Sequence, residues 1–234
     1  SENKNPLASF LNAFNCDPLS AFGSVIGCNY KISKKLALEI AKNFIEVIMA
    51  NGFEKEALNI LKKKKNLRII DISNYKFKDI NSIKSFNGSF LLQSKNKIIL
   101  DKKKLKCVTK LKPNRRELAE VEFAFNVCKY VKSNSIVLCN NFSTIGIGAG
   151  QPSRLDSCKI AVQKAKQFQL SKIKNSVAAS DAFFPFADGV QALIRAGVKT
   201  IIQPGGSIRD QEVINAANKA KIKMLFTGIR HFYH

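Results

Sequence analysis

The sequence contains no long hydrophobic run. Its 234 residues are 45% apolar, which is enough for a packed core. No stretch approaches the ~20 consecutive apolar residues that a membrane-spanning helix needs, and the N-terminus lacks the apolar segment of a secretory signal peptide. We therefore expect a cytoplasmic protein of one large or two small domains that contacts no membrane.

Metal-ligand motifs are missing as well. The six cysteines are widely scattered without a C-x-x-C pair, and the only two histidines lie at the C-terminus. A zinc site needs clustered ligands, and a disulfide framework is unusual in a chain of this size without export signals. The sequence predicts no metal, small buried cysteines and exposed terminal histidines. The residues concerned are Cys16, Cys28, Cys107, Cys128, Cys139, Cys158, His231 and His234.

Acidic residues are scarce, and the net charge is +22. Residues 31–112 alone hold 21 basic and 7 acidic residues. A basic segment suggests nucleic acid, but this excess is nearly all lysine, without the arginines and interleaved aromatics of a specific reader. We interpret it as a solvated face and expect no nucleic-acid partner. A non-catalytic nucleotide- or nucleic-acid-binding protein with a lysine-rich face is the alternative hypothesis.

A dinucleotide fingerprint is absent too. The glycine series 146–150 resembles G-x-G-x-x-G, but the motif would need glycine at Gln151, and the acidic residue expected further on is not found. A simpler interpretation is a strand that lies so close to another backbone or to a ligand that side chains are excluded. Arg154 follows beside the predicted start of a helix, where anions are favoured. We favour a ligand role for Arg154 over that of an ordinary surface arginine.

Two strand–loop–helix units follow one another after residue 176, which predicts an α/β fold. The first loop carries three phenylalanines and Asp188, and the second reads P-G-G-S. Sheets of this class place their ligand sites in the loops after the strands. The first loop suits a planar ligand. The second offers backbone N–H groups to an anion or a carbonyl oxygen, with a well-capped turn as a serious alternative.

Hydrophobic periodicity and turn residues predict the secondary structure. Helices are expected at residues 6–14, 34–50, 54–65, 114–131, 155–168, 188–197 and 210–220, and strands at 25–28, 67–72, 135–139, 144–147, 177–179, 200–203 and 224–226. Asn114 and Glu117 have the spacing of a capping box. Glu46 falls in the apolar last turn of the 34–50 helix, where its neighbours suggest burial. A ligand contact and a surface carboxylate are even alternatives for it.

Several long motifs in the chain resemble one enzyme family. They are CDPLSAFG, YVKSN, TIGIGAGQPSR, ASDAFFPFADG, IQPGGSIRDQEV and the terminal TGIRHFYH. In this order, and over essentially the whole chain, they are similar to the C-terminal part of the bifunctional purine-biosynthesis enzymes, AICAR transformylase/IMP cyclohydrolase.

The resemblance implies a formyltransferase. The formyl group would pass from the co-substrate 10-formyltetrahydrofolate to AICAR, giving FAICAR, without a metal and in a homodimer with shared active sites. The implied fold is a cytidine-deaminase-like three-layer α/β/α arrangement with two similar subdomains, which we place at residues 1–130 and 131–234. The IMP cyclohydrolase activity of full-length members belongs to a domain that this chain does not match.

The resemblance also carries over two sets of ligand residues. The positions that match AICAR contacts are Gly23, Glu46, Asn134, Arg154 and Arg230. The positions that match the folate side are Leu155, Phe183, Asp188, Ser207 and Ile208. Ala187 stands where the family usually has arginine, and Ser24 stands where bacterial members usually have glycine. The family's catalytic Lys-His pair matches a segment upstream of Pro6, so we expect no catalytic residue in this chain.

A protein consisting of residues 1–234 alone is therefore predicted not to catalyse formyl transfer at a normal rate. The amine of AICAR is a weak nucleophile because its lone pair is delocalised, and general acid–base groups typically supply ~10²–10⁴-fold. A formyl-transfer assay of the purified chain measures this. Turnover equal to that of a complete family member would show that the catalytic groups have been misplaced.

Overall fold

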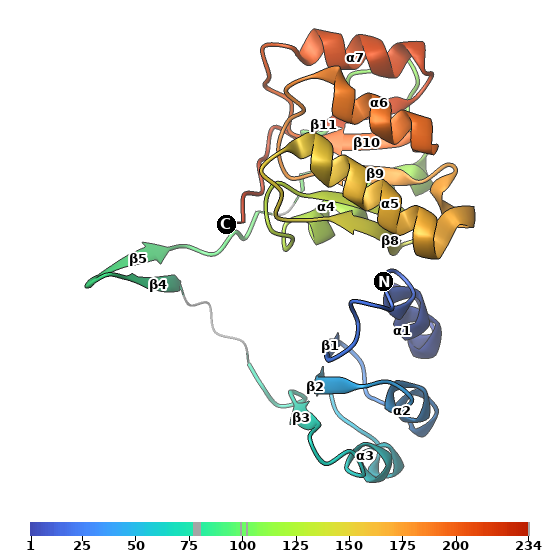
Figure 1. The fold of residues 1–234 in the computed structure, drawn as a ribbon, viewed down its shortest axis with the longest axis vertical. Helices are drawn as coiled ribbons and strands as arrows, with labels where there is room; N and C mark the ends of the chain where they lie inside the picture. Colours follow the sequence, from blue (N-terminus) through green and yellow to red (C-terminus); the bar gives the residue numbers. More distant parts are fainter. Residues whose placement is uncertain (77–80, 99, 102, 234) are drawn as a thin grey trace. The chain divides into compact units, whose positions relative to one another are not determined.

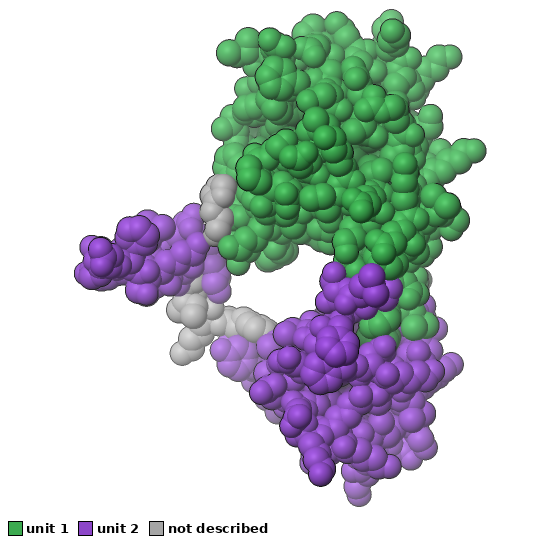
Figure 2. All heavy atoms as spheres, in the orientation of Figure 1, with its two compact units in different colours: residues 1–4, 9–17, 99–234 green, residues 5–8, 18–98 purple. Residues whose placement is uncertain are grey.

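The computed structural model describes residues 1–76, 81–98, 100–101 and 103–233. The chain forms two compact units (Figure 2). The larger unit consists of residues 1–4, 9–17 and 99–234, and the smaller unit consists of residues 5–8 and 18–98. The proposed subdomain division between residues 130 and 131 stays a prediction.

The larger unit is built on a six-stranded sheet with the order β6-β11-β10-β9-β7-β8. These strands are β6 (Lys106–Cys107), β7 (Ile136–Asn140), β8 (Ser143–Gly148), β9 (Val177–Ser180), β10 (Thr200–Gln203) and β11 (Lys223–Phe226). β9, β10 and β11 are parallel, whereas β7 runs antiparallel to both β8 and β9. All residues of β9 and β10 are buried, as is usual for parallel strands covered on both faces.

Helices cover both faces of this sheet. α5 (Arg154–Ile173), α6 (Ala187–Ala196) and α7 (Asp210–Lys219) lie on one face, and α4 (Arg115–Cys128) lies on the other (Figure 1). Successive residues of a strand point to opposite faces. Accordingly, Ile136 and Leu138 of β7 join the core beneath α5–α7, while Val137 and Cys139 join the core beneath α4. The α/β class is confirmed; the cytidine-deaminase-like fold with two similar subdomains stays a prediction.

The ends of two helices follow the predicted local chemistry. Asn114 and Glu117 form a complete capping box at the start of α4, because Asn114 Oδ1 accepts the Glu117 amide at 2.9 Å and Glu117 Oε2 accepts the Asn114 amide at 2.8 Å. Gly197 ends α6 in the left-handed region at φ 107°, a conformation that glycine adopts without steric cost.

The glycine series is explained by close packing of α5 on β8. A Cβ atom at Gly148 would overlap the backbone carbonyl of Ser157, and one at Gly146 would overlap that of Ala161. The backbone of a helix, rather than a ligand, therefore excludes side chains at these two positions.

The smaller unit contains a parallel sheet with the order β1-β2-β3. Its elements are β1 (Ser24–Cys28), α2 (Lys34–Ala41), β2 (Ile45–Ala50), α3 (Lys55–Leu61) and β3 (Arg68–Asp71), with both helices on one side of the sheet (Figure 1). A separate hairpin consists of β4 (Ser82–Phe86) and β5 (Ser89–Gln93). Helix α1 (Pro6–Phe14) contributes residues to both units.

One expected element is wrong: residues 34–50 do not form a single helix. Helix α2 ends at Ala41, and residues 45–50 form the strand β2. The strand reads IEVIMA, which has the β-branched residues typical of a sheet. A short apolar run of this kind is compatible with either a buried strand or a continued helix by periodicity alone, and here pairing with β1 and β3 decides in favour of the strand.

Gly148→Ala should destabilise the larger unit, because its new methyl group would overlap the Ser157 carbonyl and push α5 away from β8. Overpacking typically costs about 1–3 kcal/mol. Gly27→Ala is the control, since a Cβ atom at Gly27 meets no other atom within 4 Å. Urea unfolding followed by circular dichroism measures both variants. Wild-type stability of Gly148→Ala would contradict this packing.

Candidate functional site

Several loops meet at one edge of the larger sheet. The carboxyl ends of the parallel strands β9, β10 and β11 lie at this edge. The antiparallel β7 begins at the same edge, because Ile136 pairs with Ser180 at the end of β9 and with Gly148 at the end of β8. In open α/β sheets, ligands bind outside the carboxyl ends of the strands. This edge is therefore where a ligand site is expected.

A cleft of about 450 Å³ lies between these loops, formed entirely by residues of the larger unit. Six of the ten ligand residues predicted from the resemblance line it, namely Asn134, Arg154, Leu155, Phe183, Asp188 and Arg230. A second hollow, of about 600 Å³, runs along α4 and contains none of the ten. We take the first cleft as the candidate site because the predicted residues converge there.

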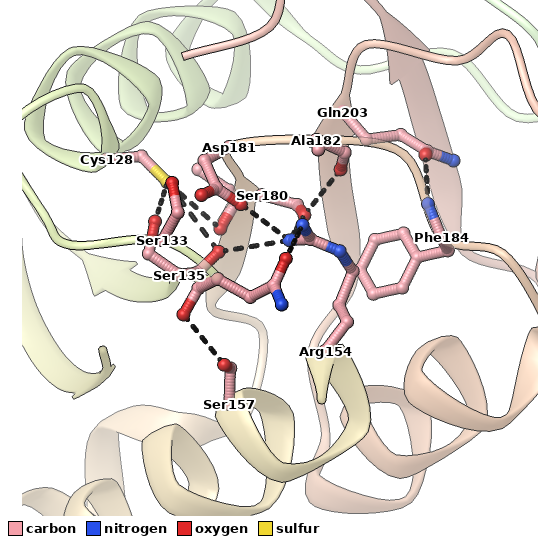
Figure 3. Close-up of polar contacts among 12 residues, drawn as sticks. Cys128, Ser133, Ser135, Arg154, Ser157, Ser180, Asp181, Ala182, Phe184 and Gln203 are labelled. Atoms are coloured by element: carbon pink, nitrogen blue, oxygen red, sulfur yellow. Dashed lines mark hydrogen bonds and ion pairs between the residues drawn. The ribbon is translucent and has the colours of Figure 1, made fainter. Parts of the chain in front are cut away.

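Arg154, the first residue of α5, is largely buried, with 8% of its surface exposed. Its Nη1 donates to Asp181 Oδ1 at 2.6 Å and to Ser180 Oγ at 2.7 Å (Figure 3). Its Nη2 donates to Asn134 Oδ1 at 2.6 Å. Asp181 is fully buried, so the charge of Arg154 is compensated inside the protein. Arg154 therefore offers the cleft directed N–H groups rather than a free positive charge.

Asn134 is fixed at both ends of its side chain. While Oδ1 accepts from Arg154, Nδ2 donates to the carbonyl oxygens of Gln151 and Pro152, each at 2.9 Å. Its backbone carbonyl accepts from Ser157 Oγ at 2.8 Å. Asn134 thus ties the start of β7 to the loop before α5 and to the helix itself.

Arg230 is exposed, unlike Arg154. Its guanidinium lies 4.9 Å from the centre of the Phe183 ring, which is a cation–π geometry. Within the described part of the chain, no hydrogen bond or ion pair engages Arg230. The cleft therefore has an uncompensated positive charge next to an aromatic face.

The C-terminal segment that carries Arg230 is held by backbone hydrogen bonds. The amide of His231 donates to the carbonyl of Asp181 at 2.8 Å, and the amide of Ser133 donates to the carbonyl of Tyr233 at 2.9 Å. The amide of Tyr233 donates in turn to Ser133 Oγ at 3.0 Å. Chain termini commonly fray, so these bonds explain how Arg230 keeps a defined place in the cleft.

The expected exposure of His231 is wrong, whereas His234 lies outside the described residues. His231 is 1% exposed, and its ring packs against Phe125 at 4.4 Å between centroids. Burial and, to a smaller extent, the positive charge of Lys129 lower the pKa of His231 to about 4, although the negative charge of Asp181 acts in the opposite direction. His231 is therefore a neutral core residue at pH 7.

Asp188 lies in the first turn of α6, and its Oδ1 accepts the Gly189 amide at 2.6 Å. A carboxylate at this end of a helix is favoured by the helix dipole. Ala187 is buried, and its amide donates to Glu212 Oε1 at 3.3 Å. Two carboxylates, those of Asp188 and Glu212, therefore lie at this helix start, and the guanidinium of Arg209 lies 4.8 Å from the ring of Phe186, the residue before the helix.

Ser207 and Ile208 do not line the cleft. The amide of Gly206 donates to Asp210 Oδ2 at 2.7 Å, and Ser207 Oγ accepts the Arg209 amide at 3.1 Å. The P-G-G-S loop is therefore a turn closed by the chain's own side chains, and the alternative of an anion-binding nest is not favoured. Ile208 is fully exposed. The folate-side role of both residues stays a prediction.

Gly23 and Glu46 are neighbours in the smaller unit. A Cβ atom at Gly23 would lie 3.5 Å from Glu46 Oε1, and Glu46 Oε2 lies 3.8 Å from Arg68 Nη1. The Glu46 side chain is 53% exposed, which fits the alternative of a surface carboxylate rather than the burial that its neighbours suggest. Its position on a strand explains the difference, because Ile45 and Glu46 point to opposite faces. Their AICAR contacts stay a prediction.

Other residues of types that often take part in catalysis or metal binding lie in environments typical of structural residues. Burial raises the pKa of the Cys128 and Cys158 thiols to about 12, so both are neutral core residues. Among the residues that the structure describes, no cluster of three His, Cys, Asp or Glu side chains could hold a metal ion. No helix in the same residues is long and apolar enough to cross a membrane.

Two residues of the site were missed by the sequence analysis. Asp181 directly follows the apolar strand β9. An acidic residue at the end of a buried strand is the sequence feature that could have indicated Asp181 as a site residue. Gln203 ends β10, is fully buried, and its Oε1 accepts the amide of Phe184 at 2.9 Å. Gln203 thereby fixes the phenylalanine loop, although nothing in its sequence context distinguishes it from an ordinary strand residue.

These features define an α/β protein with a cleft at the carboxyl ends of its strands, lined by arginine and aromatic side chains. Residues 1–164 match the family model described as the AICARFT/IMPCHase bienzyme. Because this match covers well over half of the chain, the protein belongs to that family.

Curated relatives agree with this assignment. The chain is 44% identical over 226 residues to the bifunctional purine biosynthesis protein PurH of Aquifex aeolicus, covering 97% of this chain and 44% of that protein. It is 46% identical over 242 residues to PurH of Bartonella tribocorum, covering 100% of this chain and 45% of that protein. The chain thus spans less than half the length of these relatives. A solved structure, reduced HcgD from Methanocaldococcus jannaschii, covers 88% of this chain and 73% of its own with 10% identity, but its TM-score of 0.22 is too low to support any argument.

Burial of His231 predicts a pH dependence of stability. Its pKa is near 6.5 in the unfolded chain and about 4 in the folded one, so the unfolded state binds more protons between these values. The contribution of the neutral His231 to the free energy of unfolding is fully present above pH 6.5 and is lost as the pH falls towards 4. At about 1.4 kcal/mol per pKa unit, the loss is on the order of 3 kcal/mol. Urea unfolding of wild type and His231→Gln at pH 4.5 and 7.5 measures it, and an equal change in both proteins would contradict the assignment.

Proposed function

We propose that this chain carries the ligand site of an AICAR transformylase, which transfers a formyl group from 10-formyltetrahydrofolate to AICAR in purine biosynthesis. The single observation that carries the proposal is the convergence of Asn134, Arg154, Leu155, Phe183, Asp188 and Arg230 on one cleft. Four separate segments of the sequence supply these residues, and the family resemblance selects all six of them from the sequence alone.

The cleft's chemistry supports AICAR as the ligand. A phosphorylated ribotide needs a cation, and the uncompensated guanidinium of Arg230 can bind phosphate oxygens in a bidentate manner. The Phe183 ring beside Arg230 provides a flat apolar surface, which suits the planar pterin of the folate co-substrate. The N–H groups of Arg154 have a fixed direction and little net charge, which suits polar groups of the ligand better than its phosphate.

The reaction to be supported is an acyl transfer. The amine of AICAR attacks the formyl carbon, the new C–N bond forms, and the bond between the formyl carbon and N10 of the folate breaks. The amine loses a proton and N10 gains one. In this chain, residues of the cleft would bind and orient the two substrates, because bringing reactants together in the right geometry is itself a large part of catalysis. We assign no residue of this chain as the acid or the base.

The same proposal includes the remaining expectations from the family. The folate would contact Leu155, Phe183 and Asp188 in the cleft, with Ser207 and Ile208 nearby. The active protein would be a cytoplasmic homodimer with active sites shared between subunits, and it would need no metal. Gly23 and Glu46, whose positions match AICAR contacts in the resemblance, would also contact AICAR.

Arg230→Ala in the full-length protein should weaken AICAR binding while leaving folate affinity nearly unchanged. A lost charge-assisted hydrogen bond is worth roughly 1.5–3 kcal/mol, so about a tenfold or greater increase in Kd is expected. Titration calorimetry with each ligand measures both affinities. Arg195→Ala is the matched control, because Arg195 is also an exposed arginine of the larger unit but lies outside the cleft.

The rival hypothesis is that Arg230 only packs the C-terminal segment. In that case Arg230→Ala would lower the melting temperature but bind AICAR like the wild type, and the proposed function would lose its phosphate contact.

A further inference from the structure

Asp181 occupies a central position next to the cleft without lining it. Its Oδ1 forms the buried ion pair with Arg154 at 2.6 Å, and its backbone carbonyl accepts the amide of His231, the residue after Arg230. One residue at the end of β9 thus contacts the two segments that carry the cleft's arginines. In Figure 3, Asp181 and Ser180 lie on one side of the Arg154 guanidinium.

Stability alone gives no reason for this ion pair. Both side chains are nearly or fully buried, and replacing a buried ion pair with well-packed apolar residues is often neutral or stabilising. Asp181 Oδ2, moreover, has no hydrogen-bond partner among the described residues, which is unfavourable for a buried carboxylate. The arrangement is therefore better explained by a requirement on the orientation of Arg154.

The geometry of Arg154 makes such a requirement specific. A guanidinium has five N–H groups in a rigid plane. Acceptors from Asp181, Ser180 and Asn134 hold one edge of that plane, and within the described part of the chain its Nε–H has no acceptor. Because the guanidinium of Arg154 is rigid, fixing one of its edges also fixes the direction of its remaining N–H groups. Arg154 lines the cleft, so these groups have a set direction there.

We propose that Asp181 is a positioning residue, which orients Arg154 so that its remaining N–H groups face the bound substrate. This rests on the proposed function for the identity of the substrate, AICAR. Asp181 itself does not touch the ligand; it acts through Arg154, and its effect should disappear when Arg154 is absent.

A double-mutant cycle in the full-length protein tests this dependence. Asp181→Asn removes the charge but keeps the shape, and it should raise the Kd for AICAR at least about tenfold. In an Arg154→Met background the same substitution should change the Kd less than about twofold, because the interaction it acts through is already gone. Asp17→Asn is the matched control, since Asp17 pairs with Lys164 at 2.7 Å in the larger unit, away from the cleft. Its AICAR affinity should equal that of the wild type.

Two results would overturn the proposal. One is an Asp181→Asn protein that loses thermal stability but keeps its AICAR affinity, which would make the pair merely structural. The other is an equal loss of affinity in the presence and absence of Arg154. If the Asp181→Asn protein does not fold, the Asp181→Glu variant tests the proposal instead, because glutamate keeps the negative charge but moves it away from the position of the aspartate carboxylate. If Asp181 positions Arg154, the Asp181→Glu protein should bind AICAR more weakly than the wild type. An unchanged affinity would contradict the proposal.

Failure of the proposed function is recognised separately. A wild-type protein that does not bind AICAR would refute the substrate, whereas crystal structures of wild type and Asp181→Asn would still decide the positioning. The guanidinium of Arg154 should leave its place beside Ser180 and Asn134 in the variant. An unmoved Arg154 would contradict the role of Asp181 whatever the ligand is.

Discussion

The buried ion pair between Arg154 and Asp181 holds together the functional edge of the larger unit. It joins the start of α5 to the end of β9, and Asn134 extends the same network to the start of β7. Breaking such a pair by removing one partner typically costs about 3–5 kcal/mol, because a buried charge is left without compensation. The cleft therefore depends on an interaction beneath its surface as much as on the residues that line it.

Glycine in β8 is what allows Arg154 to reach this position. Without side chains at Gly146 and Gly148, the backbone of α5 packs directly on the strand. The first residue of α5 consequently lies close enough to β9 for its guanidinium to meet Asp181. The glycine series, which resembles a phosphate-binding motif in sequence, thus serves the site indirectly, through the packing of a helix.

The sequence predicted most of the larger unit because its local signals agree with its tertiary structure. The capping box at Asn114, the glycine that ends α6 and the short buried strands all follow from local chemistry. The prediction of a single helix over residues 34–50 was wrong because hydrophobic periodicity does not distinguish a short apolar strand from the continuation of the preceding helix. The burial of His231 and the ion pair of Asp181 with Arg154, 27 positions earlier in the chain, were not predicted for a different reason. Both are set by the assembled fold, which a single sequence does not display.

The central claim is that the cleft beside Arg154, Phe183 and Arg230 binds AICAR. A crystal structure of the full-length protein grown with AICAR tests it most directly. The account predicts that the phosphate of the ligand contacts the guanidinium of Arg230 and that its heterocycle lies within the cleft. Density for AICAR at a different place, with an empty cleft and Arg230 free of phosphate, would contradict it.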